Sequence, residues 1–450
     1  MHILVINGSP KGENSITLQT VKYWEILFKE HTFTYLHAGA QIGRLEKDPS
    51  SLLPLFSETE LVLFAYPVYT FLAPSQLHRF IRLMKEQDIP VAGLFAAQIT
   101  TSKHFYDTTA QAYVRGNCED MGMHYLGGLP ADMDDLTLEK GREQARAFFK
   151  HMLWCAGNGI YEPEIPKAEP VVPKTAAVPS AVEKKPGHTV SLVTDIAPKD
   201  TSLRALTDRF LALCPYEVKI YDIHSFAFKG GCLGCFKCAA DGTCVYKDGY
   251  ADMLRSIQSG DAIVLAFSVQ DHSMGPRFKM YDDRQFANGH RTVTEGTPFG
   301  YLVSGALSRE ENLRRVIEAR AQVGGNFLAG IASDEADPDG STDRLVASLC
   351  YAVEQRYAEP RNFDGVGGMK IFRDLIYLMR GLMREDHRFF KSHGLYDFPQ
   401  KQKKRILLMY PVGSLMRNKK LQQKAGGKIN EGMLAPYTKV LEEARKGKIR

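Results

Sequence analysis

Four of the eight cysteines in this 450-residue chain fall within thirteen residues, with the spacing C-x2-C-x2-C-x5-C. Thiolates at every third position can surround one face of a cubane iron–sulfur cluster, and a fourth thiolate a few residues later closes it. A structural zinc site more often uses two separated C-x2-C pairs. The spacing therefore favours a [4Fe–4S] cluster over two alternatives, a zinc site and a metal-free loop. The predicted ligands are Cys232, Cys235, Cys238 and Cys244.

A loop suited to binding an anion follows the first apolar run. Residues 7–17 read NGSPKGENSIT and lead into an amphipathic stretch. Gly8 and Gly12 permit tight turns, Lys11 adds positive charge, and a helix N-terminus presents free N–H groups. The segment matches neither GxxxxGK[ST] nor GxGxxG, which disfavours a nucleoside triphosphate or a Rossmann-type dinucleotide. We predict a phosphate site, and the alternative is a plain strand-to-helix turn with Ser15 as its N-cap.

A second segment with ligand-binding character, residues 66–74 (YPVYTFLAP), follows the third apolar run. Ligands of doubly wound sheets bind at the carboxyl ends of strands near the switch in strand order, which in the flavodoxin-like order lies between strands one and three. We therefore expect the two segments to meet. One offers phosphate donors and the other offers apolar and aromatic surface, so together they fit a flat heterocycle that carries one phosphate.

The motifs at residues 8–15 (GSPKGENS) and 66–69 (YPVY) resemble those of flavodoxin-like NAD(P)H-dependent FMN reductases, and the cysteine spacing resembles that of the related iron–sulfur flavoproteins. The resemblance implies that the ligand is FMN, with its phosphate held by Ser9, Lys11, Asn14 and Ser15. It implies that the ring is lined by Pro67, Val68, Tyr69 and Thr70, with Thr100 and Thr101 at its polar edge. It also implies a [4Fe–4S] cluster that exchanges electrons with FMN, and NAD(P)H as a donor.

Strand-like and helix-like stretches alternate twice along the chain, which predicts two parallel sheets covered by helices. The predicted fold class is α/β, with two tandem flavodoxin-like doubly wound parallel sheets and a helical, basic C-terminal extension. The strand-like runs lie at 2–6, 33–36, 61–66, 91–97 and 123–128, and again at 189–194, 217–222, 262–267, 299–304 and 326–332. The predicted parts are an FMN-binding domain (1–160), a Pro-rich linker (161–187), a domain with the cysteine loop (188–360) and the extension (361–450), which includes a helix at 369–384.

The second half lacks the features that point to FMN in the first half. Its loop after the first strand places Asp195 and Asp200 where they would repel a phosphate, and its ring segment, residues 268–274 (SVQDHSM), lacks the Pro and Tyr. The first half has no cysteine motif. We therefore hypothesise that the tandem mimics a homodimer, so that one chain holds one FMN in its first half and one cluster in its second.

These observations predict an FMN-dependent NAD(P)H oxidoreductase that transfers electrons between the flavin and the cluster. The donor is a nicotinamide or a protein, and the acceptor is not identified. One alternative is a single-flavin quinone or nitro-type reductase without a working cluster. The other is a non-catalytic scaffold with a zinc-bound or empty cysteine loop.

The C-terminal part of the chain is basic, which bears on the partners and the location of the protein. The net charge is +5, but residues 366–450 carry 20 Lys and Arg against 7 Asp and Glu. A solvated face is favoured over contact with anionic lipid or an acidic partner, and no nucleic-acid motif accompanies the charge. The longest apolar stretch, 406–416, is shorter than the ~18 residues of a transmembrane helix. We expect a cytoplasmic protein whose cysteines are reduced. The two halves of the tandem pair with each other within one chain, or the chain forms a homodimer.

Overall fold

The computed structural model describes residues 1–163, 171–397, 403–416, 434, 438, 440–443, 445 and 446. The chain divides into two compact units, Met1–Phe390 and Lys391–Arg450. The first unit contains both sheets, and the second contains α15 (Lys403–Met416). Within the described ranges, no helix combines the length and the apolar character needed to cross a membrane.

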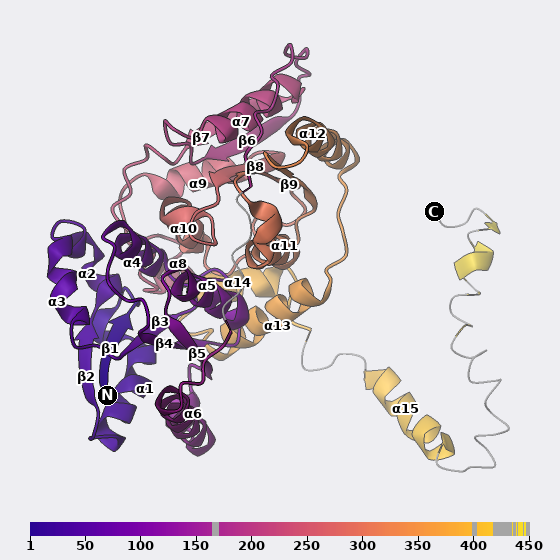
Figure 1. Ribbon diagram of the computed structural model, residues 1–450. Helices are drawn as coiled ribbons and strands as arrows, with labels where there is room; N and C mark the ends of the chain where they lie inside the picture. The colour runs from indigo at the N-terminus through magenta and orange to yellow at the C-terminus, as the bar shows by residue number, and fades with distance from the viewer. Residues whose placement is uncertain are drawn as a thin grey trace. The chain divides into compact units, whose positions relative to one another are not determined.

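The first sheet is entirely parallel and has the strand order β2-β1-β3-β4-β5 (Figure 1). Alternate residues of β1 face opposite layers: Ile3 and Val5 pack with α1 and α6, and Leu4 and Ile6 pack with α2, α4 and α5. The strands are β1 (His2–Asn7), β2 (Thr32–Leu36), β3 (Leu61–Pro67), β4 (Phe95–Ser102) and β5 (His124–Asp132). The helices are α1 (Ile16–Leu27), α2 (Ala38–Leu45), α3 (Leu53–Phe56), α4 (Ser75–Glu86), α5 (Asp107–Asp120) and α6 (Glu139–Gly157), with short 3-10 turns η1 (Gly12–Asn14), η2 (Pro49–Leu52) and η3 (Asp135–Thr137).

The second sheet is also entirely parallel, with the order β10-β9-β8-β6-β7, which repeats the order of the first sheet. Helices α7 and α12 cover one face, and α9, α10 and α11 cover the other. The strands are β6 (Thr189–Thr194), β7 (Glu217–Asp222), β8 (Ala262–Ser268), β9 (Phe299–Ser304) and β10 (Leu328–Ser333). The remaining elements are α7 (Thr201–Leu213), α8 (Lys237–Asp241), α9 (Tyr250–Gln258), α10 (Gly275–Arg284), η4 (Gln285–Asn288), η5 (Leu307–Arg309), α11 (Glu311–Gly324), α12 (Pro338–Gln355), α13 (Phe363–Leu378) and α14 (Arg384–Ser392).

Both sheets therefore have the flavodoxin-like order, in which the strand that follows the first crossover lies at the edge. The predicted fold class of two doubly wound parallel sheets is confirmed. The strand predicted at 91–97 lies instead at Phe95–Ser102, because Gly93 takes a left-handed turn (φ +81°) and the strand continues through buried polar residues. The helix predicted at 369–384 begins earlier, at Phe363, where the Asn362 side chain accepts from the backbone N–H of Asp364 (3.0 Å).

The two halves share one hydrophobic core. Helix α4 packs against α10 and α5 packs against α11 (Figure 1). Buried side chains of all four helices belong to a single continuous cluster that includes Leu77, Tyr113, Phe278 and Val316. Burial of apolar surface stabilises this arrangement by about 25 cal/mol per Å². The two sheets of the first unit are therefore held together by a shared hydrophobic core.

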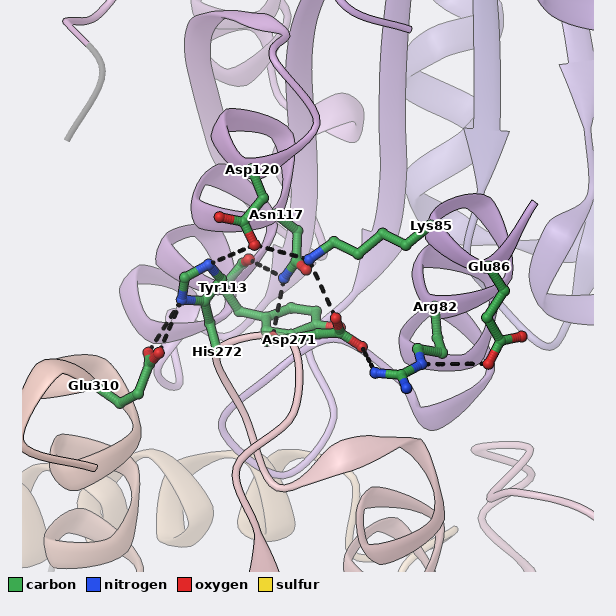
Figure 2. A network of polar contacts seen from close by, with 9 residues as sticks. All are labelled: Arg82, Lys85, Glu86, Tyr113, Asn117, Asp120, Asp271, His272 and Glu310. Atoms are coloured by element: carbon green, nitrogen blue, oxygen red, sulfur yellow. Dashed lines mark hydrogen bonds and ion pairs between the residues drawn. The ribbon is translucent and has the colours of Figure 1, made fainter. Parts of the chain in front are cut away.

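The interface also carries charge. The two ring nitrogens of His272 donate to the carboxylates of Asp120 on α5 (3.1 Å) and Glu310 of the second half (3.1 Å), as Figure 2 shows. The neighbouring Asp271 accepts from Lys85 (3.1 Å) and Arg82 (3.2 Å) of α4. Its hydrogen bonds to the carboxylates of Asp120 and Glu310 raise the pKa of His272 to about 10.

Candidate functional site

One cavity of about 210 Å³ lies at the carboxyl ends of the strands of the first sheet, and three parts of the chain line it. The first half contributes the loop after β1 and the segment after β3. The second half contributes the cysteine loop, residues 230–246, and the helix α13 contributes Ile371, Phe372 and Leu375. The predicted residues found in its wall are Ser9, Lys11, Ser15, Pro67, Val68, Tyr69, Thr70, Thr101, Cys232, Cys235, Cys238 and Cys244.

The loop after β1 is held by its own hydrogen bonds. The backbone N–H of Gly8 donates to Ala65 O (2.9 Å), which joins the loop to β3. The side-chain amide of Asn7 donates to Gly12 O (2.7 Å), and Gly12 has φ +54°, a left-handed conformation that favours glycine. These bonds turn the loop so that Ser9 and Ser15 lie in the cavity wall.

Ser15 is the N-cap of α1, but its side chain makes no capping bond. Its Oγ is buried and has no partner among the described residues. The helix N-terminus places free N–H groups and a partial positive charge at the same point. An unpaired buried hydroxyl, a helix N-terminus and Lys11 together fit a phosphate group, so the residues present are suited to FMN.

Two predicted residues lie outside the cavity wall. Asn14 is exposed at the end of η1. Thr100 is buried, and its hydroxyl accepts from Gln111 Nε2 (3.1 Å) on the α5 side of the sheet. Side chains alternate along a strand, so the next residue, Thr101, faces the opposite side, where its hydroxyl bonds that of Thr17 (2.5 Å).

The ring segment after β3 has an unusual backbone. Thr70 (φ +41°) and Phe71 (φ +70°) both have left-handed backbone conformations, which residues other than glycine rarely adopt. Tyr69 exchanges backbone hydrogen bonds with Leu72 (2.8 and 3.1 Å), which closes the turn. Tyr66 points away from the cavity, and its hydroxyl donates to Gln98 Oε1 (2.5 Å). Strain of this kind persists only where surrounding contacts impose it.

Those contacts come from α10 of the second half. The buried Lys279 Nζ donates to Tyr69 O (2.9 Å) and Thr70 Oγ1 (2.6 Å) and pairs with Asp283. Asp283 in turn accepts from Thr70 Oγ1 (2.5 Å) and from the backbone N–H of Ser75 at the start of α4 (2.7 Å). We call Lys279 and Asp283 the α10 clamp. It ties the ring segment of one half to a helix of the other.

The cysteine loop lies directly against the ring segment. A Cβ atom placed on Gly234 would lie 2.1 Å from Tyr69 Oη, so only glycine allows this approach, and its φ of +59° also favours glycine. The side-chain amide of Gln76 donates to Cys232 O (3.2 Å), and Lys11 Nζ lies 5.6 Å from the centre of the Phe236 ring. The predicted flavin segments and the predicted metal ligands therefore share one site.

The four cysteines offer thiolate sulfur, the kind of ligand that binds zinc and iron–sulfur clusters. Burial raises the pKa of Cys232 to about 12 and that of Cys238 to about 11. Ligation by thiolate would therefore release protons. Among the described residues, no group of three or more His, Cys, Asp or Glu side chains is placed to hold a single metal ion. Binding of a metal by these cysteines belongs to the proposal below.

Sequence reasoning missed several residues of the wall. Arg284 at the end of α10 is buried, forms a two-pronged ion pair with Asp248 (2.9 and 3.0 Å), and donates to Cys244 Sγ (3.8 Å). It stands 40 residues from Cys244 in the sequence, so no local spacing relates the two. Phe372 of α13 stacks on Phe105 (4.7 Å between ring centres) and covers one side of the cavity.

In the second half, the loop after β6 carries two carboxylates that accept hydrogen bonds from within that half. Asp195 accepts from His224 Nδ1 (2.9 Å), and Asp200 accepts from the backbone N–H of Ala197 (2.9 Å). Burial raises the pKa of Asp195 above its usual range. A phosphate at this loop would meet two negatively charged side chains.

Comparison with known proteins supports the resemblance. No family model matches the chain. An iron-sulfur flavoprotein from Archaeoglobus fulgidus is 28% identical over 176 residues, which cover 36% of this chain and 78% of that protein. The predicted resemblance to flavodoxin-like reductases and iron–sulfur flavoproteins is thereby confirmed.

Solved structures of flavin enzymes match about one third of the chain. An FMN-dependent NADH-azoreductase from Bacillus anthracis in complex with FMN is 14% identical and covers 35% of this chain and 99% of its own (TM-score 0.28). An NAD(P)H:(acceptor) oxidoreductase from Paracoccus denitrificans is 21% identical, and the match covers 34% of this chain and 97% of that protein (TM-score 0.28). Because these TM-scores are low, the fold assignment rests on the strand order of the two sheets.

Proposed function

We propose that the chain is an FMN-dependent NAD(P)H oxidoreductase whose cysteine loop holds a [4Fe–4S] cluster beside the flavin. One observation carries the proposal: the predicted phosphate loop, the ring segment and all four cysteines line the same cavity, although they come from different halves of the chain. The similarity to an iron-sulfur flavoprotein supports it. One chain would then hold one FMN and one cluster.

Different residues of the cavity wall would bind different parts of FMN. Ser9, Ser15 and Lys11 would hold the FMN phosphate, and Pro67 to Thr70 would line the ring. Burial keeps the pKa of Tyr69 well above its usual range, so its hydroxyl keeps its proton and can donate a hydrogen bond. When bound, FMN would accept a hydride from a nicotinamide and the cluster would exchange single electrons. The cavity wall formed by Phe105 and Phe372 would limit access of water.

The first test is the absorbance spectrum of anaerobically purified protein, with iron, zinc and FMN quantified per chain and dithionite then added. We expect one FMN, about four iron atoms, and a broad shoulder near ~400 nm that bleaches on reduction. A yellow protein without iron would leave a single-flavin quinone or nitro-type reductase. A colourless protein that resists reconstitution would indicate the scaffold, and two FMN per chain would exclude the one-flavin arrangement.

A cysteine variant sharpens the assignment of the cluster. Cys238→Ser is expected to lose most of the iron and the ~400 nm shoulder while it retains FMN, because the cluster would lose one of its four ligands. Cys350→Ser is the matched control, since Cys350 lies on α12 away from the cavity. Equal iron content in the two variants would contradict ligation by the cysteine loop.

A further inference from the structure

The helix α15 of the second unit has exposed apolar side chains on every side. Its residues 406–410 are consecutive, and the exposed fractions of Ile406, Leu407, Leu408, Met409 and Tyr410 are 42, 68, 59, 48 and 71%. Successive residues of an α-helix are about 100° apart, so five in a row cover the whole circumference. An ordinary surface helix has one apolar stripe. α15 therefore needs an apolar environment that surrounds more than one face.

The charged residues that flank this helix in the sequence all have the same sign. The sequence from 398 to 430 contains no Asp or Glu. It contains nine basic residues, which are Lys401, Lys403, Lys404, Arg405, Arg417, Lys419, Lys420, Lys424 and Lys428. Lys403 and Lys404 begin the helix and are exposed. Basic residues that flank an apolar helix are attracted to the negative surface potential of anionic lipids.

We propose that α15 binds the surface of an anionic lipid bilayer. Its apolar residues would enter the interfacial region, and Lys403 and Lys404 would contact lipid phosphates. Fourteen residues of helix span about 21 Å, less than the ~30 Å of the hydrocarbon core, so α15 is too short to cross the membrane. A second copy of the chain is a poorer occupant, because its own basic flanks would meet these with like charge. The inference does not depend on the proposed redox function.

The test is co-sedimentation of the full chain with vesicles. We expect the chain to pellet with equimolar phosphatidylglycerol and phosphatidylcholine and to stay in solution with phosphatidylcholine alone. Lys403→Glu with Lys404→Glu should weaken binding at least about tenfold, because two attractive charges become repulsive. Leu407→Ser with Leu408→Ser should weaken it to a similar degree, because less apolar surface enters the interface.

The matched control reverses two exposed lysines of α6, Lys140→Glu with Lys150→Glu, and should bind like the parent chain. Binding by the serine variant equal to that of the parent would overturn insertion of the helix. A parent chain that stays in solution with anionic vesicles would overturn the proposal outright. Self-association that the serine substitutions abolish, without any vesicle binding, would overturn it in favour of a second copy. Far-UV circular dichroism of each variant checks that the body remains folded.

Discussion

The Ser15 hydroxyl is buried in the cavity wall, and it has no hydrogen-bond partner within the described ranges. An unpaired buried polar atom costs roughly 1–3 kcal/mol, so such an atom at a helix N-terminus is a natural donor to a ligand. The neighbouring Ser9 Oγ accepts a hydrogen bond from the backbone N–H of Lys11 (3.2 Å), and its O–H can still donate to a ligand. Ser15 differs from Ser9 in that its hydroxyl has no partner among the described residues, so its hydrogen bond depends on the ligand.

Ser15→Ala is expected to weaken FMN binding about 10- to 100-fold, because a hydrogen bond to a charged group contributes roughly 1.5–3 kcal/mol. Titration of the apoprotein with FMN, followed by flavin fluorescence, measures the change. Ser57→Ala serves as the control, since its hydroxyl is exposed and donates to Pro54 O (2.9 Å). Equal FMN affinities in the two variants would show that Ser15 does not contact the phosphate.

At the scale of elements, α10 of the second half holds the ring segment of the first. The α10 clamp is fully buried, and its lysine and aspartate satisfy both the strained backbone near Thr70 and the start of α4. A buried pair of this kind is strongly destabilising when one partner is removed, because the other charge remains without compensation. The clamp therefore links the geometry of the ring segment to the packing between the halves.

Asp283→Asn is expected to lower the free energy of unfolding by about 3 kcal/mol and to weaken FMN binding, because Lys279 remains buried with less compensation. The double change Lys279→Met with Asp283→Asn should recover part of the stability, since no net charge stays buried. It should not recover FMN affinity, because Tyr69 O and Thr70 lose the lysine that positions them. Urea unfolding and FMN titration measure the two effects. Arg255→Met, at an exposed position of α9, is the control, and recovery of FMN affinity in the double variant would contradict a positioning role.

The elements themselves were predictable from the sequence, and the clamp was not. The alternation of apolar runs predicts both sheets, because buried parallel strands read as continuous apolar segments. The glycines and hydroxyls of residues 8–15 predict the loop after β1 because their chemistry is local. Lys279 and Thr70 are 209 residues apart, so only the packing of one half on the other brings them together. Phe372 is a similar case: the sequence predicts the helix that carries it, but it does not predict that this helix lines the cavity.

At the scale of the molecule, the segment of the second half that corresponds to the ring segment lies in the interface between the halves. This segment, residues 268–274, carries Asp271 and His272, both in left-handed backbone conformations, into contact with α4 and α5 of the first half (Figure 2). The charged groups that surround His272 in this network are Asp120, Glu310, Asp271 and Glu86 as carboxylates and Lys85 and Arg82 as cations. The charges balance best when His272 is protonated.

The pH dependence of stability follows from this balance. The folded pKa of His272 is about 10, raised by hydrogen bonds to Asp120 and Glu310, and the unfolded value is about 6.5. A raised pKa contributes stability that is complete below pH ~6.5 and is lost as the pH rises toward ~10. His272→Gln should therefore lower the free energy of unfolding at pH 6, on the order of 2 kcal/mol after allowance for partial exposure. The difference should shrink steadily toward pH 10.

Urea unfolding of the parent chain and of His272→Gln at several pH values between 6 and 10 measures this convergence. His2→Gln is the control, because His2 lies at the exposed start of β1, far along the sequence from the interface. A constant difference across the range would mean that His272 acts through packing alone. Convergence of the two curves would show that the halves are held together in part by a protonated histidine, so that the contact between the halves weakens in alkaline solution.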